Sequence, residues 1–262
     1  MLESLLLALF PSVPAAPPRA EPPAALQDDD KPDKRPEIAE LLERLKKHVA
    51  ENGQEDQLAV EVIDQLATEF PKCGEKDRAA IVKGVDACFK EKRKPTDEGA
   101  PDNLLHLAAA TALGEMGPES AKPLAGWIDH KSLRKDLNLQ RAIILALGKT
   151  KAESGIEPLV DLLDHHQATM QAAGAEALGN YDKEDQEVRK EIFEAILKVL
   201  TALKNNVDAD VNDVISRERY EAISAAMIGT LQKMSGHDAR DPSDWTHWWN
   251  KNKKEDWDAG KG

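Results

Sequence analysis

The chain has 262 residues, 41% of them apolar but only 4% aromatic, which suits one large domain or two small ones. Long β-branched or aromatic alternations are missing, so a β-sandwich or β-barrel is not expected. The formal net charge of −13 disfavours nucleic acid as a partner, since an acidic chain repels phosphate backbones. No apolar run reaches the roughly 18 residues of a membrane span. We therefore expect a soluble helical protein with no membrane span and no nucleic-acid partner.

Residues 1–36 differ from the rest of the chain in holding eight of its 15 prolines. This proline density predicts an extended or disordered segment. The opening MLESLLLALF resembles the apolar part of an export signal, although the run is short and Glu3 stands where a basic residue is expected. The alternatives are export to the periplasm or cell envelope and a disordered tail on a cytoplasmic protein. The stretch QDDDKPDKRPE reads as a charged linker.

From residue 37 onward the sequence is a succession of helical patterns separated by short breaks. Apolar residues recur on one face at a 3.6-residue period, for example at Leu58, Val62 and Leu66. One of the breaks is predicted at 205–213, and no strand pattern appears. The predicted helices are 37–51, 54–70, 75–91, 102–116, 119–130, 135–149, 153–165, 168–181, 184–204, 214–235 and 242–256.

An internal repeat organises these helices. SAKPLAGWIDH at 120–130 aligns with GIEPLVDLLDH at 155–165, so that Pro123 corresponds to Pro158. The preceding helices also match, and one glycine marks the same position in four copies, the last of them weak: Gly114, Gly148, Gly179 and Gly229. A single hairpin cannot bury its apolar stripe alone, whereas stacked hairpins share a continuous core. The predicted fold class is therefore all-α, an α-α superhelix of about five helical hairpins.

A helix ending in Ala-Leu-Gly, a short turn, and a helix that opens with Pro-Leu and closes with Leu-Leu-Asp resemble the HEAT repeat. The closest variety is the short bacterial HEAT-like repeat related to that of phycobilisome lyases. The stretch LLDHHQATMQAAGAEALGNY fits best, but it has Met170-Gln171 where that repeat usually has Val-Arg. The resemblance implies a concave surface lined by the second helix of each pair. It identifies a fold and not an activity.

The histidines, cysteines and acidic loops favour structural roles. Iron-binding relatives of this fold use His-Glu pairs, and no histidine here is followed by glutamate. His130 and His165 recur at one repeat position, where they are expected to bind free carbonyls at helix ends; metal binding is the alternative. Cys73 and Cys88 are predicted to lie too far apart for a disulfide. No catalytic residue, cofactor site or metal site is predicted.

The sequence DADVND, at 208–213, resembles the start of a calcium-binding loop. It lacks the glycine at the sixth position and the glutamate at the twelfth that such a loop requires. We therefore interpret it as a solvated acidic loop between two helices, with calcium binding as the alternative.

The C-terminal segment 241–262 is rich in tryptophan. Trp245, Trp248 and Trp249 are spaced to share one helix face, and Asp241, Ser243 or Asp244 is expected to cap that helix. A similar DPxxWxxWW ending is found in bacterial HEAT-repeat proteins, notably those of planctomycetes. The three tryptophans either seal the last core layer or form an exposed anchor for a partner protein or a sugar.

These observations divide the chain into an N-terminal segment (1–36), a repeat domain (37–240) and a capping segment (241–262). The predicted function is a non-catalytic scaffold that binds an as yet unknown protein partner, plausibly in the cell envelope, with the protein itself a monomer. The acidic balance favours a partner with a basic patch. The alternatives are a cofactor-handling or lyase-like HEAT enzyme and carbohydrate or peptide binding through the tryptophans.

Overall fold

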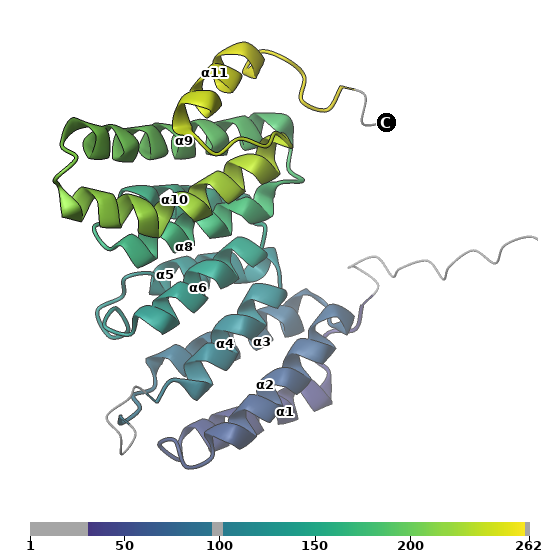
Figure 1. Ribbon diagram of the computed structural model, residues 1–262. Helices are drawn as coiled ribbons and strands as arrows, with labels where there is room; N and C mark the ends of the chain where they lie inside the picture. Colours follow the sequence, from purple (N-terminus) through teal and green to yellow (C-terminus); the bar gives the residue numbers. More distant parts are fainter. Residues whose placement is uncertain (1–30, 96–101, 260–262) are drawn as a thin grey trace, which may run out of the picture.

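The computed structural model describes residues 31–95 and 102–259 (Figure 1). This part of the chain contains eleven α-helices and no β-strand, which confirms the predicted fold class. The helices are α1 (Pro36–Val49), α2 (Asp56–Glu69), α3 (Glu75–Ala87), α4 (Leu104–Glu115), α5 (Ala121–Trp127), α6 (Leu137–Lys149), α7 (Ile156–Asp161), α8 (Ala168–Leu178), α9 (Gln186–Ala209), α10 (Val214–Ser235) and α11 (Pro242–Asn252).

Consecutive helices pair into five hairpins that stack in order, from α1–α2 to α9–α10 (Figure 1). The even-numbered helices α2, α4, α6, α8 and α10 pack side by side in one layer, and the odd-numbered helices form the other. Helix α11 lies against α9 at the end of the stack. One cluster of buried apolar side chains extends from Ile38 in α1 to Trp245 in α11. The described part of the chain is thus a helical-hairpin stack with a single continuous core.

Two helices of the odd-numbered layer are shorter than the repeat alignment predicts. Helices α5 and α7 have 7 and 6 residues, and a 3₁₀ turn precedes each of them. Both contain the repeat proline, Pro123 or Pro158, within the first turn. Proline is tolerated there because the missing N–H would have no partner inside the helix. The repeat proline therefore lies near the start of a short helix.

Helix α9 is longer than predicted. It has 24 residues and runs through the expected break to Ala209, so that the connection to α10 shrinks to 210–213. An ion pair between Lys204 and Asp208 joins side chains one turn apart in this extension. The predicted break at 205–213 is wrong in its first half. Residues 205–209 are mostly exposed, and the helix extends through them because adding residues to a helix that has already formed costs less than starting one.

Glycines let the even-numbered helices approach closely. A Cβ atom added at Gly114 would lie 2.9 Å from Cα of Ala146, and one added at Gly148 would lie 2.6 Å from the carbonyl oxygen of Ala177. In a two-layer stack the layer with the closer spacing is the inner one, so these contacts place the even-numbered helices on the inside of the superhelix. Gly229, the weak fourth copy, faces open space. The sequence match at that position does not extend to the packing.

Two buried glutamines at equivalent repeat positions fix the ends of the short odd-numbered helices. Gln140 accepts a hydrogen bond from the N–H of Asp129 (2.6 Å) and donates one to the carbonyl of Trp127 (3.2 Å). Gln171 donates to the carbonyl of Leu163. Each glutamine thereby holds the turn that precedes its own helix.

The last residues of the predicted linker, 31–35, form a strap on the start of α3. The Asp33 carboxylate accepts hydrogen bonds from the N–H groups of Lys76 (2.9 Å) and Asp77 (3.2 Å). The Asp77 carboxylate in turn accepts two backbone hydrogen bonds from the strap, each of 2.9 Å. These five residues belong to the folded part of the chain, which begins earlier than the predicted boundary at residue 37.

The two cysteines are free, as predicted, and both are buried. The Cys88 thiol lies in the 3₁₀ turn after α3, and burial raises its pKa to about 12. Burial also raises the pKa of Cys73. Both thiols are therefore small buried groups held in the protonated form.

The segment that resembles an export signal, within residues 1–30, lies outside the described residues. None of the helices in the described ranges is long and apolar enough to cross a membrane.

Candidate interaction surfaces

The three tryptophans predicted as a site lie together on α11, which Asp241 caps by accepting a hydrogen bond from the N–H of Ser243 (2.8 Å). All three indole rings surround the Phe193 ring of α9. The ring centroids of Trp245, Trp248 and Trp249 lie 5.8, 5.3 and 5.1 Å from that of Phe193, respectively. Trp245 is fully buried, whereas Trp248 and Trp249 are half-buried. The aromatic faces of α11 are therefore engaged with α9.

A fourth tryptophan, Trp257, completes this cluster from the segment after α11. Its ring centroid lies 5.5 Å from that of Phe193 and 5.2 Å from that of Trp248. The buried side chain of Arg189 lies beside the Trp257 ring. It donates a hydrogen bond to the carbonyl of Met234 (3.2 Å) and forms an ion pair with Asp258. Sequence reasoning missed Phe193 and Trp257 as members because nothing in their spacing shows which helix α11 contacts.

This placement separates the roles of the tryptophans. Trp245 cannot stack on a sugar or a partner because its side chain has no exposed area. Trp249 lines an open groove of about 550 Å³ that also contains Lys190, Glu191 and Lys253. Since its ring stacks on Phe193, 24° from parallel, only its outer part faces that groove. The cluster covers the end of the hydrophobic core.

The repeated histidines do not bind helix carbonyls as expected. The Nδ1 atom of His165 accepts a hydrogen bond from the N–H of Gln167 (3.1 Å). The Nδ1 atom of His130 lies 2.7 Å from the Ser132 hydroxyl, and the N–H of Ser132 points to it at 3.4 Å. Both imidazoles thus accept from the turn that follows instead of donating to the helix that precedes it. Among the described residues, no group of three His, Cys, Asp or Glu side chains is placed to hold a metal ion.

The acidic loop before α10 has its own internal partners. The Asp213 carboxylate caps α10 by accepting hydrogen bonds from the N–H (3.1 Å) and the hydroxyl (2.6 Å) of Ser216. These bonds lower the pKa of Asp213. The Asp210 carboxylate accepts from the N–H of Asn212 (2.9 Å). The carboxylates of 208–213 thus all have partners: Asp208 pairs with Lys204 within α9, and the other two bond within the loop and at the start of α10.

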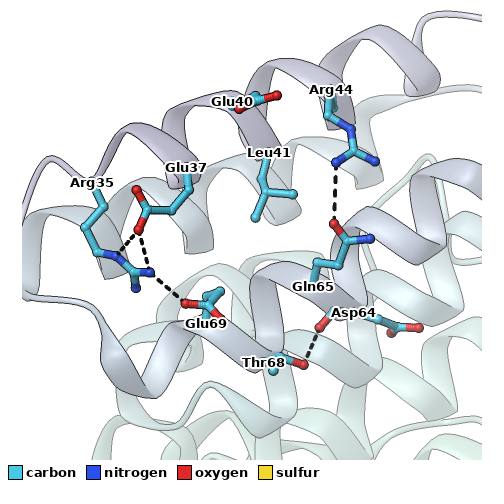
Figure 2. Close-up of a pocket in the computed structure, with 9 residues that line it drawn as sticks. All are labelled: Arg35, Glu37, Glu40, Leu41, Arg44, Asp64, Gln65, Thr68 and Glu69. Carbon is cyan, nitrogen blue, oxygen red and sulfur yellow. Dashed lines mark hydrogen bonds and ion pairs between the residues drawn. The ribbon is translucent and has the colours of Figure 1, made fainter.

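A groove of about 570 Å³ lies between α1 and α2 at the end of the stack opposite α11 (Figure 2). Leu41 forms part of its floor, and every other lining side chain is polar or charged: Arg35, Glu37, Glu40, Arg44, Asp64, Gln65, Thr68 and Glu69. Four of these residues are acidic and two are basic. The groove therefore has an excess of negative charge.

Arg35 forms ion pairs with two of the four acidic residues of the groove. The Arg35 guanidinium bonds both Glu37 (2.9 Å) and Glu69 (2.8 Å), and these bonds raise its pKa. Bonds from Lys72 and then Arg35 lower the pKa of Glu69. Arg44 donates a hydrogen bond of 3.5 Å to the amide oxygen of Gln65 (Figure 2). It forms no ion pair with a carboxylate of the described residues.

Glu40 and Asp64 are the remaining carboxylates of the groove. Neither has an ion-pair partner among the described residues, and both are exposed. They lie on α1 and α2, respectively, so a ligand in the groove would pass between them.

Comparison with protein families matches residues 139–165 to the PBS lyase HEAT-like repeat. The matched stretch contains most of α6, all of α7 and the 3₁₀ turn that ends at Asp164, that is, the second helix of one hairpin and the first helix of the next. No curated protein matches the chain significantly. Residues 139–165 are thus similar to a PBS lyase HEAT-like repeat, and the all-helical stack of hairpins around them is consistent with a HEAT-like repeat protein.

Proposed function

We propose that this protein is a non-catalytic scaffold that binds a partner protein. HEAT-like stacks commonly serve as interaction scaffolds, and the groove between α1 and α2 carries the proposal for this chain. At its C-terminal end the stack is covered by α11, whereas the α1–α2 groove is lined only by these two helices and Arg35. It is open at the surface and has the size of a ligand site.

The charge of the groove favours a basic segment of the partner. Glu40 and Asp64 supply two carboxylates without ion-pair partners in the described part of the chain, and Leu41 supplies an apolar contact between them. The net charge of −13 attracts a basic partner from a distance and raises its association rate. This agrees with the expectation that the acidic balance selects a partner with a basic patch.

The test is affinity capture from extracts of the source organism with the full-length chain and with a variant carrying Glu40→Lys and Asp64→Lys. A matched control carries Glu115→Lys and Glu221→Lys, two exposed positions outside the groove. A partner retained by the wild type and the control but lost by the groove variant supports the proposal. Equal retention by all three proteins overturns the role of the groove, and retention of nothing by the wild type overturns the scaffold function.

We further propose that the protein acts in the cell envelope after export. The proposal is supported by the apolar opening MLESLLLALF and the small residues that follow it. Cell fractionation with N-terminal sequencing of the mature protein tests it. A shortened chain in the periplasmic or envelope fraction is the expected result, and a full-length chain confined to the cytoplasm contradicts it.

A further inference from the structure

The exposed apolar side chains of the stack gather at one edge. All even-numbered helices run in the same direction, so their N-termini lie along one side of the molecule (the left side in Figure 1). Every large hydrophobic side chain that is exposed in the described residues lies at or just before one of these helix starts: Leu58, Leu104, Leu137, Val211, Val214 and Ile215. Leu104 is 45% exposed and Leu137 36%. These exposed side chains do not belong to the buried core of the stack.

Two loops at the centre of this edge are basic although the chain as a whole is acidic. Residues 90–94 read KEKRK and residues 131–135 read KSLRK. Arg93 is not available to a partner, because its buried guanidinium donates hydrogen bonds to the Asp56 carboxylate and to the carbonyl of Val49. The other cations make no ion pair within the described ranges: Lys90, Lys92, Lys94, Lys131, Arg134 and Lys135. We call these six residues, with Leu104 and Leu137, the basic edge.

Two grooves meet at the basic edge and share Lys135. The first, of about 480 Å³, lies between the end of α3 and the loop before α6, with Phe89, His106 and Leu133 among its apolar and aromatic lining. The second, of about 390 Å³, lies between the same loop and the start of α8 and includes Arg134 and Leu137. Together they line this edge with cationic and apolar side chains, which include Lys90, Lys135 and Leu137.

The acidic residues of these grooves leave this edge cationic. Glu91 and Asp102 lie in the first groove and Asp129 in the second. Asp136 is already engaged, because it caps α6 and accepts a hydrogen bond from the Asn103 amide (2.8 Å). The N-termini of α4 and α8 also face this edge without side-chain caps, and their dipoles add positive potential.

We propose that the basic edge binds an acidic segment of a partner protein in which carboxylates alternate with apolar side chains. The carboxylates bind the lysines of the two loops and Arg134, and the apolar side chains cover Leu104 and Leu137. This rests on the proposed scaffold function but uses a second surface of opposite charge to the α1–α2 groove. A nucleic acid has no apolar side chains to cover the exposed leucines, so an acidic segment that also carries apolar residues fits the edge better.

The experiment measures binding of a fluorescein-labelled peptide of glutamate and leucine to the full-length protein by anisotropy. The edge variant carries Lys131→Glu, Arg134→Glu and Lys135→Glu. The matched control carries Lys122→Glu, Lys198→Glu and Lys251→Glu, which are exposed positions on α5, α9 and α11. Circular dichroism confirms that both variants are folded.

We expect the edge variant to bind the peptide at least about tenfold more weakly than the wild type, since each 1.4 kcal/mol of lost binding is tenfold. The control variant should bind like the wild type, and added salt should weaken binding. A second variant, with Leu104→Ser and Leu137→Ser, should also weaken binding without changing any charge. Equal binding by the edge variant and the control overturns the proposal, as does equally tight binding of polyglutamate or of single-stranded DNA.

This measurement is independent of the test of the α1–α2 groove. The peptide is acidic, so it does not bind Glu40 and Asp64. Loss of partner capture with the groove variant therefore leaves the peptide result intact. Failure of the edge variant to change peptide binding leaves the groove result intact in the same way.

Discussion

Asp33 and Asp77 each accept backbone hydrogen bonds from the segment that carries the other. The residue before α3 is Gly74, which has no side chain with which to cap the helix. Asp33 supplies that cap from a point more than 40 residues earlier in the chain. The exchange fastens the strap, residues 31–35, to the second hairpin.

Replacing Asp33 by alanine should lower the free energy of unfolding by about 1 kcal/mol, because the first N–H groups of α3 lose their acceptor. Asp33→Asn should retain most of the stability, since asparagine also caps helices. Urea unfolding followed by circular dichroism measures both effects. Glu43→Ala, at an exposed position on α1, is the control. A wild-type midpoint for Asp33→Ala would show that the cap adds nothing.

The glycines of the inner layer predict opposite results for one substitution at two aligned positions. Gly148→Ala should destabilise the protein, because its Cβ would lie 2.6 Å from the backbone oxygen of Ala177 and the helices must separate. Gly229→Ala should stabilise it by about 0.5–1 kcal/mol, because the helix gains an alanine in open space. Thermal melts of the two variants test this. A lower melting temperature for Gly229→Ala would contradict the packing described for α10.

Ending the chain after residue 240 should lower the melting temperature, because removal of α11 exposes Phe193 and the last core layer. Trp245→Ala should lower the free energy of unfolding by about 3–5 kcal/mol, the usual cost of deleting a buried large aromatic side chain. His247→Ala, exposed on the same helix, should have little effect. An unchanged melting temperature of the shortened chain would refute the capping role of the tryptophans.

His106 should make stability depend on pH. Its ring stacks on Phe89 with centroids 6.2 Å apart, Nε2 bonds the Glu91 carbonyl (3.0 Å), and burial lowers its pKa. The unfolded chain therefore binds the proton first as the pH falls below about 6.5. The stability from neutral His106 is present above that pH and is lost as the pH falls through the folded pKa.

The measurement compares the wild type with His106→Gln by urea unfolding between about pH 7.5 and pH 5, a range that includes the ordinary imidazole pKa. The wild type should lose more stability than the variant over this range. Comparing the two proteins removes the contribution of the other histidines. Parallel curves would show that His106 has the same proton affinity in both states.

The thiol of Cys88 should be inert in the folded protein. Its pKa is raised to about 12 by burial, and the thiolate is the reactive form. Iodoacetamide at about pH 8 should modify it only after urea is added, when both cysteines become accessible. Mass spectrometry of the intact chain counts the modified thiols. Rapid modification in the absence of urea would mean that the end of α3 opens locally.

The helices could be predicted well because the apolar stripes, prolines and glycines of the repeat act locally. The end of α9 could not, because Asn205 is a residue typical of turns, whereas a helix that has already formed can extend through such exposed residues. The strap escaped prediction for a related reason. Asp33 and Asp77 are both common surface residues, and only the docked chain brings them together.

The candidate surfaces were less predictable than the fold. Spacing alone placed Trp245, Trp248 and Trp249 on one face, but Phe193 and Trp257 joined them through contacts between distant segments. The histidines were assigned to the correct helix ends but with the hydrogen-bond direction reversed, because a sequence does not show which ring nitrogen faces a backbone N–H. Grooves between helices have no signature in the sequence.

Because each hairpin packs mainly on its neighbours, we expect the hairpins to fold in chain order during synthesis. The main contacts of the stack join adjacent hairpins, so each can dock soon after it leaves the ribosome. The strap stays open until Asp77 has been made. The last core layer stays partly uncovered until Trp257 has been made. A chain that stops before Trp257 would keep part of an aromatic surface exposed, and cellular proteases would remove it.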